Sequence, residues 1–292
     1  MSGSTCRGLT ITGGSRRLLG RANSTTGALS VESSSKVRDW HSEPFRVLVT
    51  LGESTTAGGW SSSRERCWAN VLADLISDFQ DGPVKLVNSG IGANVISTRA
   101  PLYEFSGKPA ANERVGKHVI AHDPDLLVIS YGLNDARGGT PVEMFREELT
   151  SVIDAIRAEC DPLVVLPGPY YMTDFTSYEH FGFANHAVFE SFNFVTAQVA
   201  ETTDCLFADV YNAYGGAEWL VHHDGVHAND LGHRVVANEI FKVLAQHCSG
   251  LAARTKRLEY ETEPWRDESV LMADYGYKSR GRPTIGLPPG QT

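Results

Sequence analysis

The stretch FRVLVTLGESTT, residues 45–56, joins a short apolar run to a turn of small residues. Its apolar part, 45–51, is rich in strand-forming side chains and leads into a glycine, which predicts a buried strand. Ser54 follows at the strand-to-helix turn, where a hydroxyl is exposed and the amides of the next helix point toward it. The stretch therefore predicts a serine nucleophile, although Gly-Ser-Thr loops are common. No Gly-Lys-Ser/Thr follows, so it is not a phosphate-binding P-loop.

Predicted strands and helices alternate along the chain after this stretch. Further apolar runs typical of strands lie at residues 84–87, 125–131, 163–166 and 205–210. Apolar side chains recur at helical spacing over residues 65–80, 141–158, 185–200 and 230–247. Such alternation predicts βαβ units and an α/β fold with a parallel sheet. Ligands bind beyond the carboxyl ends of the strands in such sheets, so we expect the chemistry in the loops that follow the strands.

Three of these loops carry groups suited to acyl-transfer chemistry. The small residues of NSGIGAN, 88–94, allow backbone N–H groups to face a developing oxyanion, and the Asn134 amide in GLND, 132–135, is a second donor. In HHDGVH, residues 222–227, an aspartate three positions before a histidine can orient the imidazole and stabilise its protonated form. Taken separately, each loop has a plainer interpretation as a tight turn, a helix cap or a structural histidine.

A metal site is a second interpretation of the 222–227 loop. Four side chains there are of metal-ligating type: His222, His223, Asp224 and His227. The sequence has no helical His-Glu-x-x-His pattern and no matching carboxylate cluster, which disfavours a metal in this loop. The five cysteines are widely spaced and form no Cys-x-x-Cys pair. They predict reduced structural thiols in place of a disulfide framework or a zinc ribbon.

The order of four blocks in the sequence resembles the SGNH hydrolase (GDSL esterase/lipase) superfamily. The blocks are GESTT at 52–56, NSGIGAN at 88–94, GLND at 132–135 and DGVH at 224–227, and the match spans about 45–247. The resemblance implies a flavodoxin-like α/β/α sandwich of three layers with a mainly parallel five-stranded sheet. It also implies a serine esterase that hydrolyses carboxylic ester bonds without a cofactor or metal.

The same resemblance implies a role for individual residues. Ser54 would attack the acyl carbon, His227 would take and return its proton, and Asp224 would hold the His227 ring. The implied oxyanion donors are the backbone amides of Ser54, Gly92 and Ala93 and the side chain of Asn134.

Two positions depart from the family pattern. Glu53 stands where the family usually has aspartate, so we expect different hydrogen bonding around this longer carboxylate. Ala93 aligns best with the oxyanion glycine of the family and follows Gly92. An alanine amide is chemically adequate there if its dihedral angles permit, and the sequence leaves open which of the two amides donates.

The expected substrate is a small-molecule ester, either an acyl or an acetyl ester of a small molecule, a sugar or a lipid. Nine aromatic side chains fall within residues 170–194, and the first half of this stretch is predicted to form a lid or an acyl pocket. Helical spacing assigns three later rings to the core instead: Phe189, Phe192 and Phe194. Four side chains are expected to contact substrate: Trp60, Arg137, Tyr170 and Tyr171.

Other functions remain open on the same residues. An acyltransferase would use the same triad and differ only in its acceptor, which competition between water and an added alcohol would reveal. A non-catalytic binding module on this fold is disfavoured, because all four blocks retain reactive side chains. A metal-dependent hydrolase built on residues 222–227 is a further alternative that sensitivity to a chelator would reveal.

Charge is unevenly distributed over three predicted parts. The 292 residues carry a formal charge of −9, divided as +4 over 1–42, −14 over 43–250 and +1 over 251–292. We expect a disordered leader, an SGNH hydrolase catalytic domain and a loosely packed C-terminal extension, with a homo-oligomer contact or a partner-binding arm as alternative roles of the extension. The acidic body argues against nucleic acid as a partner, because phosphate binding requires clustered basic side chains.

Neither end of the sequence indicates a membrane protein or a secreted one. No apolar run approaches the ~18 residues of a membrane span, so we expect no integral membrane association. The first residues also lack the apolar core of a secretory signal. The reduced cysteines predict a cytoplasmic protein, and the Arg- and Ser-rich, acid-poor start leaves targeting to an organelle as the alternative.

Overall fold

The computed structural model describes residues 37–262 and 269–276, and its packed unit begins at Arg38. Residues 1–36 of the predicted leader lie outside the described residues, and Cys6 lies there with them. The other four cysteines are free thiols, as the sequence predicts: Cys67, Cys160, Cys205 and Cys248.

Hydrogen bonds and an ion pair hold the described part of the leader against the body. Trp40 donates its N–H to the His247 carbonyl at 2.8 Å, and the Asp39 carboxylate accepts from the Ser249 amide at 3.0 Å. Arg38 forms an ion pair with Asp204 at 2.6 Å. The segment before the first strand therefore lies against the end of the last long helix.

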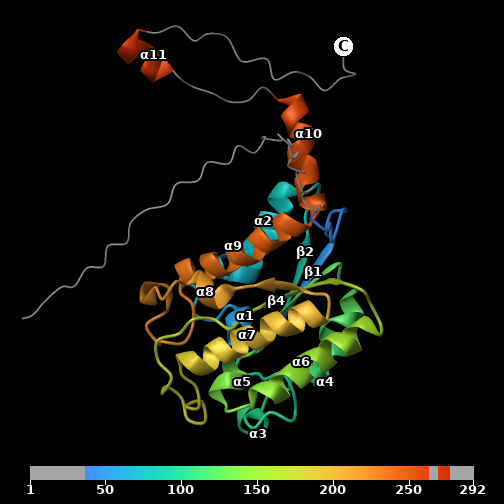
Figure 1. Ribbon diagram of the computed structural model, residues 1–292, viewed down its shortest axis with the longest axis vertical. Coiled ribbons are helices and arrows are strands. Elements are labelled where there is room, and N and C mark those ends of the chain that lie inside the picture. Colours follow the sequence, from blue (N-terminus) through green and yellow to red (C-terminus); the bar gives the residue numbers. More distant parts are fainter. Residues whose placement is uncertain (1–36, 263–268, 277–292) are drawn as a thin grey trace, which may run out of the picture. The chain divides into compact units, whose positions relative to one another are not determined.

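A five-stranded parallel sheet forms the centre of the fold (Figure 1). Its strands are β1 (Val47–Gly52), β2 (Lys85–Gly90), β3 (Leu126–Ser130), β4 (Leu163–Pro167) and β5 (Leu206–Ala208). They run in the order β2-β1-β3-β4-β5, and every neighbouring pair is parallel. All side chains of β3 are buried, as expected for an uninterrupted apolar strand between two helical layers.

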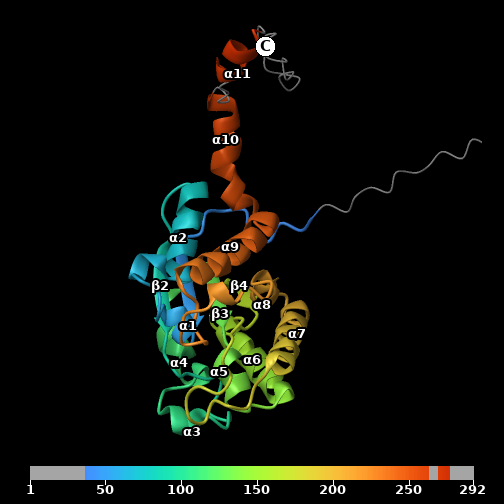
Figure 2. The same cartoon turned by 90° about the vertical axis from the view of Figure 1, so that its left-hand side faces the viewer.

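Helices cover both faces of the sheet, which gives the three-layer sandwich that the sequence predicts (Figures 1 and 2). One layer contains α2 (Trp68–Phe79) and α9 (Asp230–His247), which pack against each other. The other layer contains α4 (Ala111–His118), α6 (Val142–Arg157) and α7 (His186–Thr202). Each long helix has an apolar side toward the sheet, as the helical spacing of the apolar residues requires.

Short elements connect these layers. The short α-helices are α1 (Ser54–Ala57), α3 (Tyr103–Ser106), α5 (Leu133–Arg137) and α8 (Val210–Ala213). Single turns of 3₁₀-helix are η1 (Arg64–Arg66), η2 (Ile120–His122), η3 (Glu218–Leu220) and η4 (Ser249–Ala252). Helices α1 and α5 begin immediately beyond β1 and β3, so both place their first residues at the carboxyl edge of the sheet.

The second strand is longer than the sequence predicts. We expect a strand over 84–87 followed by a loop, but β2 continues through Gly90, which pairs with Gly52 at the end of β1. Gly90 lies so close to α1 that a Cβ atom there would stand 2.1 Å from the Ala57 amide nitrogen. Because Gly90 has no side chain, the strand can pass beneath α1. The pattern of apolar residues does not predict this contact.

The aromatic residues of α7 are divided between core and solvent. Phe189 and Phe192 are buried, as their helical spacing predicts. Phe194 is 62% exposed, so its assignment to the core is wrong. Two positions after Phe192, it lies on the opposite side of the helix, because residues two apart do not share a face.

The C-terminal extension includes two helices, α10 (Ala253–Glu261) and α11 (Ser269–Tyr275). Arg257 in α10 pairs with Asp81 at 2.7 Å, and Arg254 donates to the Asp78 carbonyl at 3.0 Å. Residues 263–268 and 277–292 of the predicted extension lie outside the described residues. Within the described part of the chain, none of the helices combines the length and hydropathy needed to cross a bilayer.

Candidate active site

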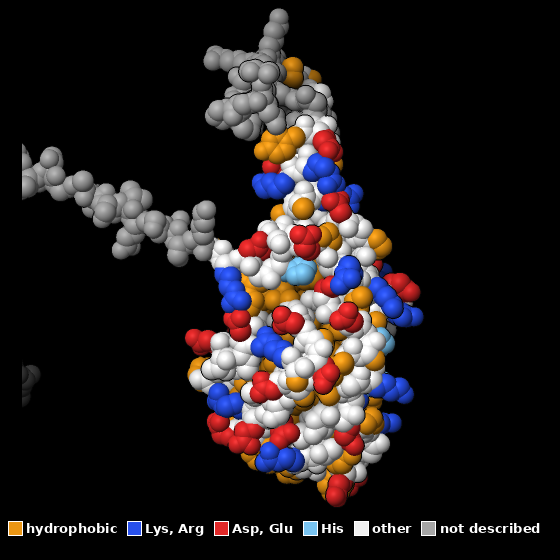
Figure 3. Space-filling view, turned by 90° about the vertical axis from the view of Figure 1, so that its right-hand side faces the viewer, with side chains coloured by type: hydrophobic (Ala, Val, Ile, Leu, Met, Phe, Trp, Pro, Cys, Tyr) orange, Lys and Arg blue, Asp and Glu red, His pale blue; other side chains and the backbone are white. Residues whose placement is uncertain are grey.

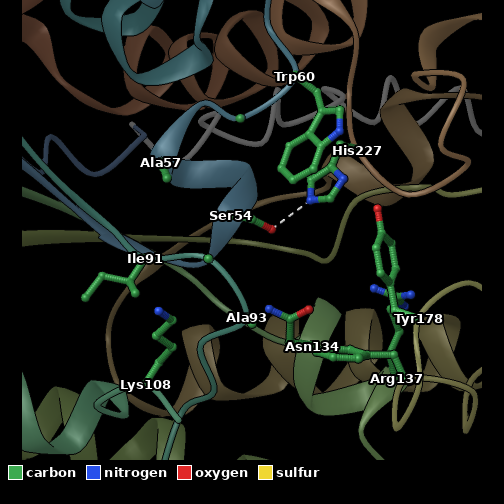
Figure 4. A pocket seen from close by; sticks show the side chains of 13 residues that line it. Ser54, Ala57, Trp60, Ile91, Ala93, Lys108, Asn134, Arg137, Tyr178 and His227 are labelled. Atoms are coloured by element: carbon green, nitrogen blue, oxygen red, sulfur yellow. Dashed lines mark hydrogen bonds between the residues drawn. The ribbon is translucent and has the colours of Figure 1, made fainter. Parts of the chain in front are cut away.

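A pocket of about 450 Å³ lies beyond the carboxyl ends of the strands (Figure 4). Several elements meet there: Ser54 comes from α1, Asn134 and Arg137 from α5, and His227 from the loop before α9. The lining consists of Ser54, Ala57, Gly59, Trp60, Ile91, Gly92, Ala93, Lys108, Asn134, Arg137, Tyr178, Phe181 and His227. The parallel register of the sheet brings these loops together from distant parts of the sequence.

Three side chains form a continuous chain of hydrogen bonds at the pocket. Ser54 Oγ lies 2.8 Å from His227 Nε2, and His227 Nδ1 lies 2.6 Å from Asp224 Oδ2. An ionised carboxylate only accepts hydrogen bonds, so Nδ1 carries the ring proton and Nε2 is free to accept from the serine hydroxyl. The sequence-predicted residues therefore meet in the geometry that a serine–histidine–aspartate relay requires.

A short hairpin loop holds the aspartate and the histidine in place. Asp224 Oδ1 accepts the backbone N–H groups of Val226 at 3.0 Å and His227 at 3.1 Å. The loop is closed by an antiparallel bridge between Val221 and Ala228. With both its oxygens engaged, the carboxylate has a fixed orientation toward the imidazole.

Burial and hydrogen bonding shift the pKa of both groups. Burial alone would raise the pKa of Asp224, but hydrogen bonds from the His227 ring and from the His227 and Val226 amides outweigh it and lower this pKa. Burial lowers the pKa of His227 below its ordinary value of 6.5, and the hydrogen bond and charge of Asp224 offset this only in part. At neutral pH the pair is therefore a carboxylate and a neutral imidazole, which is the state in which a histidine acts as a base.

Several N–H groups that could donate hydrogen bonds line the pocket together with Ser54. As the first residue of α1, Ser54 has a backbone N–H with no partner inside its helix. The Asn134 side chain donates to the Asn94 carbonyl at 3.0 Å, which fixes the amide and leaves it a second N–H. Gly92 and Ala93 line the same part of the pocket. Ser54, Gly92, Ala93 and Asn134 thus all line the same pocket.

Ala93 adopts a backbone conformation that favours glycine. Its φ is 54°, in the left-handed region, where a Cβ atom costs roughly 1–2 kcal/mol. The alanine therefore adopts the backbone angles of this position, with strain. Backbone strain of this kind is retained where the surrounding structure fixes a functional geometry.

Glu53 links the Ser54 turn to the Asn134 helix. Its Oε1 accepts the backbone N–H groups of Gly132 and Asn134, both at 3.1 Å. Burial raises the pKa of Glu53 well above its ordinary value, the nearby Asp135 adds to this, and the two amides oppose it. The longer carboxylate in place of the usual aspartate thus spans from the nucleophile turn to the first turn of α5.

Arg114 is a supporting residue that the sequence analysis misses. Its buried guanidinium donates to the Ser89 carbonyl at 2.7 Å, to the Gly52 carbonyl at 3.0 Å and to the Tyr131 hydroxyl at 2.7 Å. It also donates to Asn94 Oδ1 at 3.2 Å. The arginine therefore ties the ends of β1 and β2 to the loop that carries Ala93. A single arginine in a polar helix gives no local signal of such a role.

Trp60 stacks on the candidate base. Its indole is parallel to the His227 imidazole, with ring centroids 3.4 Å apart and planes inclined by 7° (Figure 4). The Trp60 backbone has a φ of 71°, a strained value for a bulky residue. Trp60 therefore lines the pocket as predicted, but its contact is with the histidine.

The first half of the aromatic stretch 170–194 reaches the pocket as predicted, but not through Tyr170 and Tyr171. Tyr170 and Tyr171 do not line it: Tyr170 is 1% exposed in the core, and Tyr171 stacks on His186 at 4.9 Å. Both tyrosines follow directly after β4, where the chain is still packed between the layers, and therefore do not reach the pocket. Tyr178 and Phe181, further along, reach the pocket instead.

The described residues contain no cluster of three or more histidine, cysteine, aspartate or glutamate side chains that could hold a metal ion. In the 222–227 loop, Asp224 binds the His227 ring, and His222 Nδ1 lies 3.4 Å from Asp224 Oδ1. The ring of His222 packs against that of His223, with centroids 4.0 Å apart. The loop thus directs its carboxylate toward the imidazole of the candidate base.

Comparison with known proteins agrees with this fold. A lipase/acylhydrolase from Enterococcus faecalis is similar at 21% identity and a TM-score of 0.53, covering 76% of this chain and 100% of its own. An acetylxylan esterase from Geobacillus stearothermophilus has 18% identity, a TM-score of 0.51 and coverages of 73% and 96%. An α/β hydrolase enzyme from the metagenome of Lake Arreo, Spain, has 20% identity, a TM-score of 0.53 and coverages of 72% and 97%.

The family assignment rests on a match of sequence. No curated protein matches this chain. The model of the GDSL-like lipase/acylhydrolase family matches residues 50–235, which is more than half of the chain and includes all four blocks. The chain therefore belongs to the GDSL-like lipase/acylhydrolase family and is a hydrolase of carboxylic esters.

Proposed function

We propose that the protein hydrolyses esters through a triad of Ser54, His227 and Asp224. The observation that carries this proposal is the unbroken hydrogen-bond chain from Ser54 Oγ through the imidazole to the carboxylate, at distances of 2.8 and 2.6 Å. Its serine end lines the pocket, where an ester can reach it. A neutral imidazole accepts the hydroxyl proton, and the carboxylate stabilises the imidazolium that forms.

The first half of the reaction transfers the acyl group to the enzyme. Ser54 Oγ bonds to the acyl carbon while its proton passes to His227 Nε2, and the carbonyl oxygen becomes an oxyanion. The Ser54 and Ala93 amides and the Asn134 side chain donate to this oxyanion, and each such donor contributes about 2.7–4 kcal/mol of barrier lowering. The carbon–oxygen bond to the alcohol then breaks, and the alcohol leaves with the proton from His227.

Water completes the cycle. A water molecule loses a proton to His227 Nε2 and attacks the acyl carbon, which forms a second oxyanion at the same donors. The bond between the acyl carbon and Ser54 Oγ breaks, the serine recovers the proton, and the carboxylic acid is released. The chain's own residues supply every proton transfer in this sequence.

We propose that the preferred acyl group is short. The pocket of about 450 Å³ must hold both sides of the ester, and the Tyr178 and Phe181 rings occupy the side next to Arg137. The acetylxylan esterase among the similar structures is named for an acetyl ester, which is consistent with a short acyl group. Sugar, lipid and simple alcohol esters remain alternatives on the alcohol side.

Hydrolysis of p-nitrophenyl esters of increasing acyl length tests the proposal. Ser54→Ala should lower kcat/KM by roughly 10⁴-fold or more, because the nucleophile is lost while the pocket remains. Ser151→Ala, at an exposed position on α6, is the matched control and should retain the wild-type rate. Substantial activity in Ser54→Ala would exclude Ser54 as the nucleophile.

A further inference from the structure

Arg137 is a buried cation without a carboxylate partner. It is 2% exposed, ends α5 three residues after Asn134, and lines the pocket together with Ser54 and His227. Its Nη2 donates to the Ser177 carbonyl at 2.7 Å, while its Nε is buried with no hydrogen-bond partner. Among the described residues, Arg137 has no Asp or Glu oxygen within 4.0 Å.

No carboxylate in the part of the chain that the structure describes touches this guanidinium, and Glu53, Asp174 and Asp224 attract its charge only from beyond 4.0 Å. Its central carbon lies 4.9 Å from the Phe181 ring centroid and 5.7 Å from that of Tyr178. Burial lowers the pKa of Arg137, yet an arginine remains protonated at neutral pH. A buried charge that lacks an ionic partner is costly, and arginine is rarely buried without one. An anion that enters the pocket would supply the missing partner.

The charge of the pocket has the opposite sign to that of the body. Its lining contains two cationic side chains, Arg137 and Lys108, and no aspartate or glutamate. Lys108 reaches the pocket from the side opposite Arg137 (Figure 4). On the face shown in Figure 3, acidic and basic side chains are interspersed, and residues 43–250 carry −14 overall. The cationic pocket is therefore a local feature.

We propose that the ester substrate bears a carboxylate, and that Arg137 attracts this carboxylate while the ester carbonyl lies at Ser54. This inference rests on the proposed function and adds the charge class of its substrate. Tyr178 is 52% exposed and its ring centroid lies 5.7 Å from the central guanidinium carbon, so the proposal requires this side chain to give way to the carboxylate. Arginine suits this role because its planar, permanently charged group donates to carboxylate oxygens in two parallel bonds.

Two pairs of esters test the inference, each with one anionic and one uncharged member of the same shape. In 4-acetoxybenzoate and 4-acetoxybenzamide the difference lies on the alcohol side. In the monophenyl ester of adipic acid and its amide it lies on the acyl side. Each kcat/KM is divided by the uncatalysed rate at the same pH. The wild type should prefer the anionic member of at least one pair by ~10-fold or more, because hydrogen bonds to charged groups are stronger than those between neutral groups.

Variants separate recognition of charge from support of the fold. Arg137→Met should remove the preference, so that kcat/KM falls more for the anionic ester than for the uncharged one, whereas Arg137→Lys should keep much of the preference. Lys108→Met, at an exposed residue, should weaken the preference partially. Lys117→Met is the matched control, since Lys117 is exposed and does not line the pocket, and its preference should equal that of the wild type.

Different results overturn the inference and the proposed function. A wild type with equal rates within both pairs, or an Arg137→Met that keeps the preference, contradicts the carboxylate inference alone. Hydrolysis of the uncharged esters by Ser54→Ala contradicts the triad. A wild type that cleaves none of the four esters contradicts both. If Arg137→Met does not fold, the salt dependence of the wild-type preference decides: a preference that rests on charge must weaken as ionic strength rises.

Discussion

The indole of Trp60 lies parallel to the imidazole of His227, with 3.4 Å between the ring centroids. Trp60 reaches this position through a left-handed backbone, with φ at 71°, and stays 41% exposed. The indole therefore covers one face of the imidazole, limits its rotation and excludes water from it. A tryptophan face also attracts a cation, by ~0.5–2 kcal/mol, so the stack favours the imidazolium that forms during the reaction.

Replacement of Trp60 should slow the chemical step. We expect Trp60→Ala to lower kcat by about 10-fold with a smaller change in KM, because the indole acts on the base more than on the bound ester. Trp60→Phe, which keeps an aromatic face, should lose less. Trp219→Ala is a suitable control, because the Trp219 side chain is 75% exposed and does not line the pocket. A Trp60→Ala enzyme with wild-type kcat would show that the stack is incidental.

Glu53 should act through its hydrogen bonds and not through its charge. Burial raises its pKa well above the ordinary value, and its Oε1 accepts the amides of Gly132 and Asn134. Glu53→Gln keeps an acceptor oxygen and should stay within about 3-fold of the wild-type kcat/KM. Glu53→Ala leaves two buried amides without an acceptor and should lose roughly 1–3 kcal/mol per amide in the free energy of unfolding. Steady-state kinetics and chemical denaturation would measure both, and equal damage in the two variants would contradict this view.

Ala93 offers a test of backbone strain. Because Ala93 has a φ of 54°, Ala93→Gly removes a steric cost of the Cβ atom of ~1–2 kcal/mol. It also adds a conformational-entropy cost of folding of ~0.5–1 kcal/mol. We expect the free energy of unfolding to rise slightly, by up to about 1 kcal/mol, with activity retained. Ala93→Val, whose branched side chain is disfavoured in this region, should lose stability and oxyanion binding together. A valine variant with wild-type stability and kcat/KM would contradict the role of this backbone angle.

The dependence of activity on pH should report His227. Burial lowers its pKa below 6.5, and only the neutral imidazole can accept the serine proton. The kcat/KM for an uncharged ester should therefore rise with pH through a midpoint below 6.5 and be lost as pH falls through it. A profile that is flat between about pH 5 and 9, or a midpoint above 6.5, would argue against this base.

Asp224→Asn gives a directional check on the same profile. The carboxylate raises the pKa of His227 against the larger effect of burial, so its removal should move the midpoint to still lower pH. It should also lower kcat, by roughly 10⁴-fold, since the ring loses the partner that fixes its tautomer.

Much of this arrangement is predictable from local patterns. The helix expected over 230–247 is Asp230–His247 in the structure, because an uninterrupted apolar period lies between clear end signals. Ser54, Asn134 and His227 could be placed together without knowing any distance, since parallel strands end at one edge of the sheet. The family blocks then distinguish these loops from ordinary turns.

Contacts between distant residues could not be predicted in this way. Ser54 and His227 are 173 positions apart, and nothing local indicates that Trp60 would stack on the same ring. Tyr170 and Tyr178 are both tyrosines of the same aromatic stretch. Tyr170 is buried in the core and Tyr178 lines the pocket, because the chain leaves the sheet between them. Such differences depend on the path of the loop, which composition does not encode.

Reaction with a fluorophosphonate that carries a reporter group would examine the nucleophile itself. The reagent phosphonylates an activated serine hydroxyl and releases fluoride, and peptide mass spectrometry locates the adduct. We predict a single adduct on Ser54 in the wild type, none in Ser54→Ala, and much slower labelling in His227→Ala, with Ser151→Ala labelled as the wild type. An adduct on a different serine, or equal labelling of the wild type and Ser54→Ala, would contradict the assignment of Ser54 as the nucleophile.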